Sequence, residues 1–598
     1  MGHAVTYVFA ALCVLAITYR FYGVFFVHRI LKINDAEPTP AHQFEDGKNY
    51  VPTRKWVTAG QHFAAIAAAG PLVGPVLAAQ FGFLPGYLWL LIGAVIGGAV
   101  HDTVVLFASM KTRGLSLSEV AKTELGPVAG WSTCLAMLFI ITVTMAGLSM
   151  VVVNALEHNP WGTFAVFVIV PISIALGMHE RFAGASRYAT AIAVIAVIGG
   201  VLVGPYIKDM PIGQWMTLNK KTLSLILPCY AFFMSALPVW MLLTPIGYLS
   251  SFLKVGVFTA LAVGVIFVNP TIEFPAVVTQ FVHGGGPVLN GPLWPFVSIT
   301  IACGAISGFH AFVGSGVTPK LIDKWSDILP VAFGSMLLEC FVGVMALVAA
   351  TSLHPEDYFA INAAPAAFQG LHMQVVELPR FIQEVGLNLY GRTGGAVTLA
   401  VGMTKIFTSV PWFEHLAAHL FEFVVMFEAV FILTAVDSGT RIARYMIQDL
   451  GGDFYHPLKN VNWVPGMLIA SLLACLGWGY LLASGDISSI WALFGVSNQL
   501  MASIGLIIGA TVILRLSQRY SYMMTCLVPL AYLYVTVNYA GYWMVENVYL
   551  NTGSKGYNVF NGVITIIELA LGLVILGSAI RRWTKLAVRK PQLAAQAA

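Results

Sequence analysis

Fifteen apolar segments, each long enough to cross a lipid bilayer as a helix, follow one another along the 598 residues of this sequence. A membrane-spanning helix needs about 20 mostly apolar residues, and it satisfies its own backbone hydrogen bonds where no water is present. The segments lie near residues 4–27, 60–82, 86–110, 130–154, 163–179, 188–206, 223–246, 252–269, 295–317, 328–352, 414–438, 464–484, 488–514, 522–545 and 557–580. This pattern predicts an all-α polytopic membrane protein with about 15 transmembrane helices.

The composition favours the same class. Asp, Glu, Lys and Arg make up only 10% of the residues, whereas soluble chains carry about 25%. The net charge of +4 is small, so we expect no nucleic acid or other polyanionic partner. The seven cysteines all fall in apolar runs without disulfide or metal spacing. We interpret them as small core residues and expect no metal and no organic cofactor.

The positions of Lys and Arg predict the orientation, because these residues are in excess in cytoplasmic loops. With the N-terminus outside, the fifteen spans place 23 of them in the cytoplasm and six outside. The apolar stretch 393–411 would reverse Arg441, Arg515 and the basic tail 581–598 if it crossed as well. We therefore predict an outer re-entrant segment within 353–411, a cytoplasmic C-terminus and a multi-pass protein of a bacterial-type inner (plasma) membrane.

Ten of the spans form two groups of five with opposite topology. After an N-terminal span and cytoplasmic loop (1–59), the first group occupies 60–206 and the second occupies 223–438. A C-terminal extension of four spans follows over 464–580. Inverted repeats of this kind are typical of secondary transporters. We therefore predict a five-plus-five inverted repeat that carries a small-molecule substrate across the lipid bilayer.

The leading span of each group is interrupted by proline and glycine. The first contains Gly70-Pro71 and Gly74-Pro75, and the second contains Pro228, Pro238 and Pro245. Proline removes a backbone donor, and unwound backbone inside a membrane must face protein or a water-filled cavity. Interrupted spans at matching places of a repeat indicate the substrate site, although ordinary proline kinks are the alternative. The predicted substrate-binding residues are Ala69, Gly70, Pro71, Gly74, Pro75, Phe233, Pro238 and Trp240.

Several long motifs are similar to those of the carbon starvation protein A (CstA) family. They are YRFYG at 19–23, DG at 46–47, YVPT at 50–53, QHFAAIA at 61–67, GPLVGPVLAAQ at 70–80, IACGAISGFHA at 301–311, SGVTPK at 315–320, FEA at 427–429 and TAVDSGTR at 434–441. The matches extend from residue 19 to residue 449, and the last four spans resemble the family less. At 245–250 this chain reads PIGYLS, without the Arg-Asp pair of the family pattern Pro-Arg-Asp-Tyr-Leu-Ser.

The resemblance implies membership of the amino acid–polyamine–cation superfamily and a LeuT-type fold. It also implies a secondary active transporter that takes up short peptides during carbon starvation. Symport of pyruvate, a small monocarboxylate, with protons is the alternative that the resemblance leaves open. A nutrient-sensing receptor with a transporter fold is a remote alternative, because only 17 residues follow Arg581 and a sensor needs a cytoplasmic output domain.

Polar side chains inside the spans are candidates for binding the coupling ion, since an ionisable group at mid-membrane costs about 2.5–3.5 kcal/mol to insert. In the implied LeuT-type arrangement, Ser307 and His310 lie beside the first interrupted helix. A histidine or carboxyl suits a proton, and hydroxyls with freed carbonyls suit sodium. We predict proton coupling and keep sodium as the alternative. The ion-coupling candidates are Ser307, His310, Ser315, Glu428 and Asp437.

Other polar residues have structural interpretations. Asp437 is also placed to pair with Arg441 at a helix end, and His310 to bond a carbonyl for packing. We interpret His101, Asp102 and Glu339 as interhelical hydrogen-bond partners, because they lie off the interrupted helices.

Two further patterns bear on the class of protein. His415 and His419, near Glu414 and Glu422, have spacing compatible with a metal ion, but the His-Glu-x-x-His order of a metalloprotease is absent. A Walker motif is also absent. We therefore predict a secondary transporter and not an enzyme, with an oligomeric state that the sequence leaves undetermined.

Overall fold

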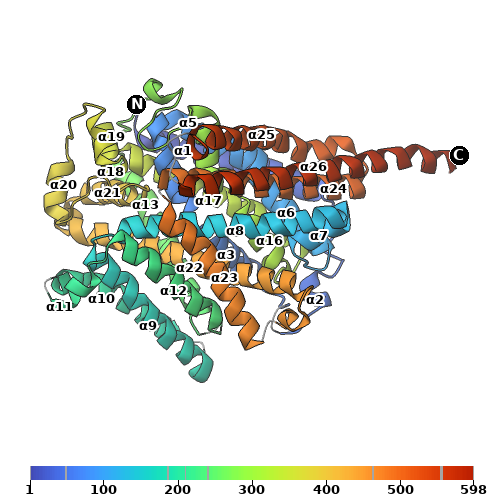
Figure 1. Ribbon diagram of the computed structural model, residues 1–598, viewed down its shortest axis with the longest axis horizontal. Coiled ribbons are helices and arrows are strands. Elements are labelled where there is room, and N and C mark those ends of the chain that lie inside the picture. The colour runs from blue at the N-terminus through green and yellow to red at the C-terminus, as the bar shows by residue number, and fades with distance from the viewer. Residues whose placement is uncertain are drawn as a thin grey trace.

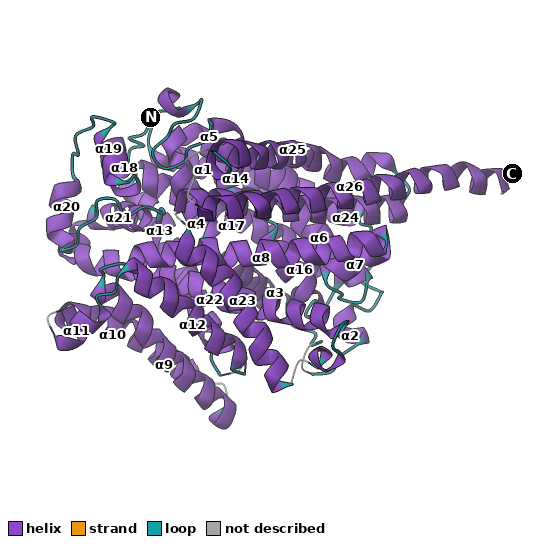
Figure 2. Ribbon diagram, viewed as in Figure 1, coloured by secondary structure: helices purple, strands orange, loops and turns teal. Residues whose placement is uncertain are grey.

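The described part of the chain is almost entirely helical. The computed structural model describes residues 2–47, 50–184, 187–208, 210–238, 241–460, 463–485, 487–551 and 556–596. Within these ranges no strand forms, and extended backbone pairs only in isolated bridges of His3 with Thr271 and of Thr53 with Ile322 (Figure 2). The predicted all-α class is confirmed.

The helices are named in chain order. They are α1 (Ala4–Ile17), α2 (Pro40–Gln43), α3 (Lys55–Ile66), α4 (Gly70–Ala78), α5 (Phe83–Gly93), α6 (Ala99–Lys111), α7 (Leu117–Leu125), α8 (Pro127–Leu156), α9 (Pro160–Ala183), α10 (Arg187–Lys208), α11 (Pro211–Met216), α12 (Lys220–Ala236), α13 (Leu243–Val268), α14 (Leu293–Thr300), α15 (Ala302–Ala305), α16 (Phe309–Gly316), α17 (Ser335–Thr351), α18 (Pro355–Asn362), α19 (Pro365–Gln369), α20 (Leu378–Val385), α21 (Ala396–Thr408), α22 (Ala417–Gly452), α23 (Val464–Ser484), α24 (Ile487–Ser517), α25 (Tyr520–Met544) and α26 (Gly556–Gln596). Short π-helical or 3-10 turns extend several of these helices, among them Thr18–Gly23, Phe26–Ile30, Ala79–Phe81, Ala94–Gly98, Leu329–Gly334, Pro411–Leu416 and Val545–Tyr549.

Twelve helices of the described ranges are long and apolar enough to cross a membrane. They are Ala4–Ile30, Phe83–Lys111, Pro127–Leu156, Pro160–Ala183, Tyr188–Ile207, Pro245–Val268, Trp325–Thr351, Pro411–Gly452, Val464–Ser484, Ser489–Ser517, Tyr520–Tyr549 and Val559–Leu586. Helices α3 and α4 together form a further candidate, bent by 46°. All of these coincide with predicted spans. The other two predicted spans, 223–246 and 295–317, contain interrupted helices, so the total of fifteen stays a prediction.

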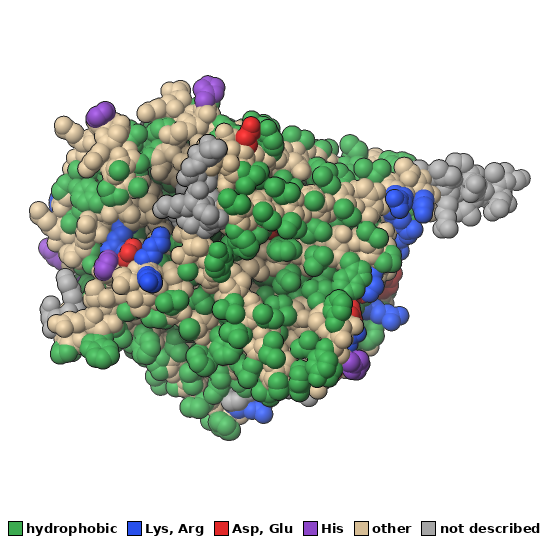
Figure 3. Space-filling view, in the orientation of Figure 1, with side chains coloured by type: hydrophobic (Ala, Val, Ile, Leu, Met, Phe, Trp, Pro, Cys, Tyr) green, Lys and Arg blue, Asp and Glu red, His purple; other side chains and the backbone are tan. Residues whose placement is uncertain are grey.

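The outer surface of the bundle suits a lipid environment. Figure 3 shows hydrophobic side chains over the middle of one face, with Lys and Arg mainly toward its two ends. On α23, for example, Ile469, Leu472, Leu473 and Leu476 are all about half exposed. Apolar side chains at this density are stable on a surface only when lipid covers them. The protein is therefore a multi-pass membrane protein, as predicted.

Segments outside the spans gather at the two ends of the bundle. Helices α18 to α21 lie at one end, on the left of Figure 1, and α2, α7 and the C-terminus lie at the other. Helix α21 falls within the stretch predicted to be re-entrant. Its 13 residues extend about 20 Å, which is less than a span needs. The Nζ atom of Lys405 near its end lies 2.6 Å from Oε2 of Glu377, just before α20.

Two interrupted helices, α3–α4 and α14–α16, lie side by side and run in opposite directions. At one end, the N–H of Thr53 before α3 donates to the carbonyl of Leu321 after α16. At the other end, Nε2 of Gln80 after α4 donates to the carbonyl of Leu289 before α14. The pair therefore crosses the bundle together and in antiparallel fashion.

The second of these helices is interrupted twice. Its backbone leaves the helical region at Ile301 (φ −93°, ψ 45°) and at Ile306 (φ −147°, ψ 109°). Helix α4 packs on the first interruption through Gly70 and Gly74. A Cβ atom on Gly70 would collide with the side chain of Cys303, and one on Gly74 would lie 2.5 Å from the carbonyl oxygen of Thr300. Glycine is needed at both positions because backbone and side chain leave no room for a methyl group.

Helices α12 and α24 have neighbours that the sequence does not reveal. Helix α12, inside the predicted span 223–246, packs mainly on α8, α22 and α23, and α14–α16 is the interrupted helix beside α4. Helix α24, in the predicted C-terminal extension, packs on α6, α8, α14 and α16. The extension therefore contributes to the centre of the molecule.

Candidate functional site

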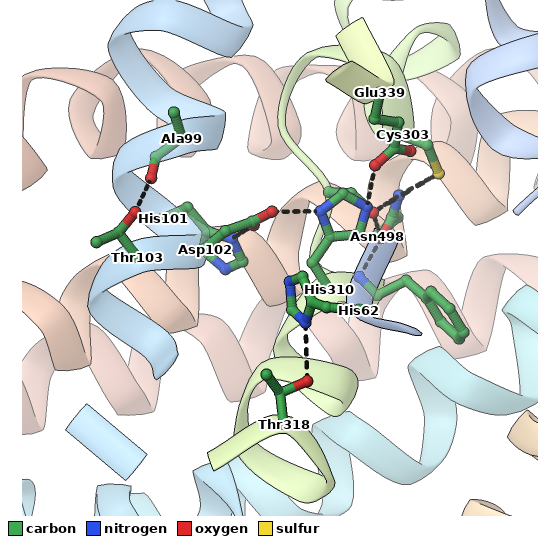
Figure 4. A network of polar contacts seen from close by, with 12 residues as sticks. His62, Ala99, His101, Asp102, Thr103, Cys303, His310, Thr318, Glu339 and Asn498 are labelled. Atoms are coloured by element: carbon green, nitrogen blue, oxygen red, sulfur yellow. Dashed lines mark hydrogen bonds and ion pairs between the residues drawn. The ribbon is translucent and has the colours of Figure 1, made fainter. Parts of the chain in front are cut away.

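A histidine held between two carboxyl groups lies in the centre of the helix bundle. His310, on the first turn of α16, has its Nδ1 atom 2.7 Å from Oδ2 of Asp102 on α6 (Figure 4). Its Nε2 atom lies 3.0 Å from Oε2 of Glu339 on α17. All three residues are at most 3% exposed. Three helices that are distant in sequence thus bring one imidazole into contact with two acidic groups.

The two carboxyl groups are held differently. The Oδ1 atom of Asp102 lies 2.8 Å from Nδ1 of His101, so both of its oxygens contact an imidazole. Gly505 on α24 makes room for His101, because a Cβ atom at 505 would collide with that ring. Among the described residues, Glu339 has its one ion pair with His310, through Oε2, and its Oε1 has no hydrogen-bond partner.

The first interrupted helix reaches the same cluster. His62 on α3 shares a 2.8 Å hydrogen bond between its Nδ1 and Oγ1 of Thr318, two residues beyond α16 (Figure 4). Lys254 on α13 is also buried, at 3% exposure, and its Nζ donates to the carbonyl of Ala64 on α3. The site therefore combines acidic and basic groups from five helices.

The depth of these groups makes them candidates for ion coupling. Asp102 lies nine residues before the end of α6 at Lys111, or about 14 Å along the helix. Ionisable side chains at such a depth are costly, and in membrane proteins they commonly line ion or proton pathways. Histidine can take up and release a proton near neutral pH. The arrangement is therefore able to exchange a proton between the imidazole and a carboxyl group.

Asn498 of α24 holds the second interruption of α14–α16. Its Oδ1 accepts a 2.8 Å hydrogen bond from the backbone N–H of Phe309, the first residue of α16. Its Nδ2 lies 3.3 Å from Oγ of Ser307 and 3.3 Å from Sγ of Cys303. Gly308 allows this contact, since a Cβ atom there would collide with the Asn498 carbonyl. The orientation of His310 at the start of α16 therefore depends on α24.

Comparison with known proteins identifies the family. The family described as carbon starvation protein CstA matches residues 3–540 of this chain. A peptide transporter CstA from Bacillus subtilis (strain 168) is 65% identical over 584 residues, which cover 98% of each chain.

The chain belongs to the carbon starvation protein CstA family.

Other similar proteins share less of the sequence. A peptide transporter CstA from Escherichia coli (strain K12) is 42% identical and covers 90% of this chain and 81% of its own. The pyruvate/proton symporter BtsT from the same organism is 39% identical and covers 89% and 80%. A solved manganese transporter from Eremococcus coleocola is 12% identical with a TM-score of 0.43, over 89% of this chain and 94% of that chain. The sequence relatives of this CstA-family chain named here are all transporters, in agreement with the predicted class.

The structure gathers most of the predicted substrate-binding residues at one place. Ala69, Gly70, Pro71, Gly74 and Pro75 are all buried where α3 gives way to α4. Elsewhere, Phe233 on α12 is 62% exposed, and its ring packs on Phe232. Pro238 lies between α12 and α13, and Trp240 lies outside the described residues. The predicted set therefore divides between two regions of this CstA-family protein.

The predicted ion-coupling residues also separate. Ser307 and His310 lie at the centre, whereas Ser315 donates to the carbonyl of Ala311 and accepts from the N–H of Leu117. Ser315 therefore fastens α7 to α16. Glu428 on α22 is 2% exposed, and neither of its oxygens has a hydrogen-bond partner among the described residues.

The pairing expected for Asp437 is different in the structure. Its Oδ2 accepts from the hydroxyl of Tyr230 at 3.0 Å. Arg441 instead donates through Nη2 to the carbonyls of Met234 and Leu237, at the end of α12. The freed carbonyls of that helix end attract the guanidinium, because the negative end of the helix dipole lies there.

Asp102, Glu339, Lys254 and Asn498 belong to the site but are not among the residues predicted for it. Asp102, Glu339 and Lys254 are ionisable residues within apolar segments, and Asn498 stands in a polar run, Ser497–Gln499, inside another. These signals are visible in the sequence, but which of them share a site is not. Among the described residues no group of three or more His, Cys, Asp and Glu could hold a metal ion. His419 instead packs edge-on against Trp161 at 5.1 Å.

Proposed function

We propose that this chain is a secondary active transporter that takes up short peptides together with protons. The name of a relative with 65% identity over 98% of both chains supports peptides as the substrate. The buried cluster of His310, Asp102 and Glu339 supports the proton as the coupling ion. The proposed location is a bacterial-type inner membrane, with the N-terminus outside and the C-terminus in the cytoplasm.

The proposal includes a LeuT-type inverted repeat with about fifteen spans. Antiparallel packing of α3–α4 against α14–α16 supports an inverted pair of interrupted helices. In this version of the repeat, α14–α16 takes the place of the predicted interrupted span 223–246. The substrate would bind where the two helices touch, beside Ala69, Gly70 and Gly74, once they separate.

The position of His310 between Asp102 and Glu339 is the observation that carries the proton proposal. A protonated imidazole can bind both carboxylates at once and so hold α16 against α6 and α17. Loss of that proton leaves two like charges near a neutral ring, which weakens both contacts. Proton binding would therefore favour one arrangement of α16 over another, which is the requirement for coupling.

Pyruvate is a second candidate substrate. The pyruvate/proton symporter BtsT is 39% identical over 89% of this chain, and it is named for the same coupling ion that the cluster favours. A peptide and pyruvate both carry a carboxylate, so one site could accept either. Competition between the two substrates would separate the candidates.

Uptake by proteoliposomes tests the proposal. Purified protein should accumulate labelled trialanine when the outside is more acidic than the inside and sodium is absent. A sodium gradient at equal pH should give no accumulation. His310→Ala should abolish accumulation but leave exchange of labelled for unlabelled peptide. His42→Ala is the control, because His42 is exposed and pairs with Asp323 outside the spans.

Three results would contradict parts of the proposal. Accumulation driven only by sodium would exclude the proton and return the role to Ser307 and its oxygen neighbours. Normal accumulation by His310→Ala would remove the cluster from coupling. Uptake of pyruvate without uptake of any di- or tripeptide would replace the substrate.

A further inference from the structure

Lys254 is an ammonium group placed inside the helix bundle, at the interruption between α3 and α4. It lies on α13, eleven residues from the first residue of that helix, and it is 3% exposed. Its Nζ atom donates to the carbonyl oxygen of Ala64 at 2.6 Å. A lysine at this depth costs free energy unless groups inside the protein stabilise its charge.

The interruption itself creates the acceptor. In a continuous helix the N–H of Ala68 would bond to the carbonyl of Ala64, but here it donates to Ile66 at 2.7 Å. The carbonyl of Ala64 is left over in the last turn of α3, where the helix dipole presents partial negative charge. Lys254 supplies the positive charge that this helix end attracts.

An aromatic face completes the surroundings of the ammonium. Nζ lies 3.7 Å from the centre of the Phe431 ring on α22, a distance that gives a cation–π interaction. Within the described residues no carboxylate lies at ion-pair distance from Lys254; Glu339 attracts it only from farther away. The ammonium is therefore bound by a backbone oxygen and a ring, as a bare cation would be.

We propose that Lys254 is a built-in cation that occupies, at the interrupted helix α3–α4, the position where a transporter would otherwise bind an alkali-metal ion. Freed carbonyls at the ends of half-helices are common ligands of sodium in transporters. Here one of them is already bound to a covalently attached ammonium. The wild-type protein consequently binds no sodium at this position, and the charge of Lys254 keeps the interrupted helix in its place.

The inference is tested without transport, so its failure is distinct from a failure of the proposed function. The measurements are binding of radioactive sodium to the purified protein and its thermal unfolding in sodium chloride or choline chloride of equal ionic strength. The wild type should bind no sodium saturably and should unfold at one temperature in both salts. Lys254→Met removes the charge and nearly keeps the length of the side chain. This variant should unfold at a lower temperature than the wild type, and sodium should raise that temperature part of the way back.

Two further variants define the role of the charge. Lys254→Arg keeps a cation and should show no response to sodium. Lys254→Gln keeps a donor without charge; if Lys254→Met does not fold, this variant should show the same response to sodium in smaller measure. Lys405→Met is the matched control, because Lys405 is 31% exposed at its side chain and pairs with Glu377 outside the spans.

Four outcomes would overturn the inference. The first is saturable sodium binding by the wild type, and the second is a Lys254→Met protein as stable as the control. The third is a destabilised Lys254→Met protein that sodium does not stabilise, and the fourth is a rise in the unfolding temperature of the wild type on addition of trialanine that depends on Lys254. The last result would make Lys254 an anchor for the carboxylate of the substrate. It would be recognised by a stabilising shift that Lys254→Met loses in both salts.

Discussion

Gly74 of α4 lies directly against the carbonyl oxygen of Thr300, at the point where α14 ends. A Cβ atom on Gly74 would be only 2.5 Å from that oxygen. The two interrupted helices thus meet backbone to backbone, so α4 cannot move toward α14 unless α14 moves as well. The proposed substrate site and the helix that carries His310 are therefore mechanically connected.

The glycine contacts give the first prediction. Gly70→Ala should reduce uptake because the new methyl group meets the side chain of Cys303, and Cys303→Gly should restore part of it. Gly74→Ala should not be rescued, because its obstacle is the backbone of Thr300. Overpacking of this kind costs about 1–3 kcal/mol. Initial uptake rates and expression of the single and double variants give the answer.

Gly60→Ala is the control for these variants, since a Cβ atom at residue 60 would meet nothing within 4 Å. Equal rescue of Gly70→Ala and Gly74→Ala by Cys303→Gly would show that the contact with Thr300 is not as the structure has it.

The second prediction concerns the acidic groups beside His310. Asp102→Asn removes the charge that faces two histidines, so accumulation against a gradient should fall by about tenfold or more, which corresponds to at least ~1.4 kcal/mol of coupling. Peptide exchange at equal pH should fall much less. Glu119→Gln on α7 is the control, because the Glu119 side chain is about half exposed and pairs with Lys122 on its own helix. An equal loss of exchange and accumulation would mark Asp102 as structural.

The third prediction concerns Asn498. Asn498→Ala leaves the N–H of Phe309 without its acceptor, and a lost buried hydrogen bond costs about 1–3 kcal/mol. The variant should unfold at a lower temperature and transport more slowly than Asn538→Ala. Asn538 on α25 is a matched control because its amide donates within its own helix, to the carbonyl of Tyr534. Unfolding of both variants at the same temperature would contradict the proposed role of α24.

The fourth prediction tests the orientation. In a background with Cys13 and Cys229 replaced by serine, His158→Cys and His283→Cys should react with an impermeant thiol reagent added to intact cells. Ser116→Cys should react only after the cells are opened. All three positions are exposed in the structure, so accessibility alone does not decide the result. Labelling of Ser116→Cys in intact cells would reverse the proposed topology.

The class of the protein follows from the sequence alone. Long apolar segments can satisfy their backbone in a bilayer only as helices, so their number and spacing predict a polytopic membrane protein without knowledge of packing. Gly70-Pro71 stands at the first turn of α4, directly after the interruption that follows α3, whereas Pro75 lies inside α4 without ending it. The sequence also indicates His310 as a candidate, because an ionisable group inside an apolar segment is costly to insert and is commonly functional.

The membership of the site depended on the tertiary structure. The interruptions at Ile301 and Ile306 carry no proline of their own. Asn498 stabilises the second one through a hydrogen bond to Phe309, from which it is 189 residues distant in the sequence. Asp102 and Glu339 reach His310 only because α6, α16 and α17 pack together. The length of the apolar segments determines which of them enter the membrane. Which of their buried polar groups meet is decided by helix packing, because a charge in the bilayer is stabilised by whichever partner the folded chain brings within contact distance.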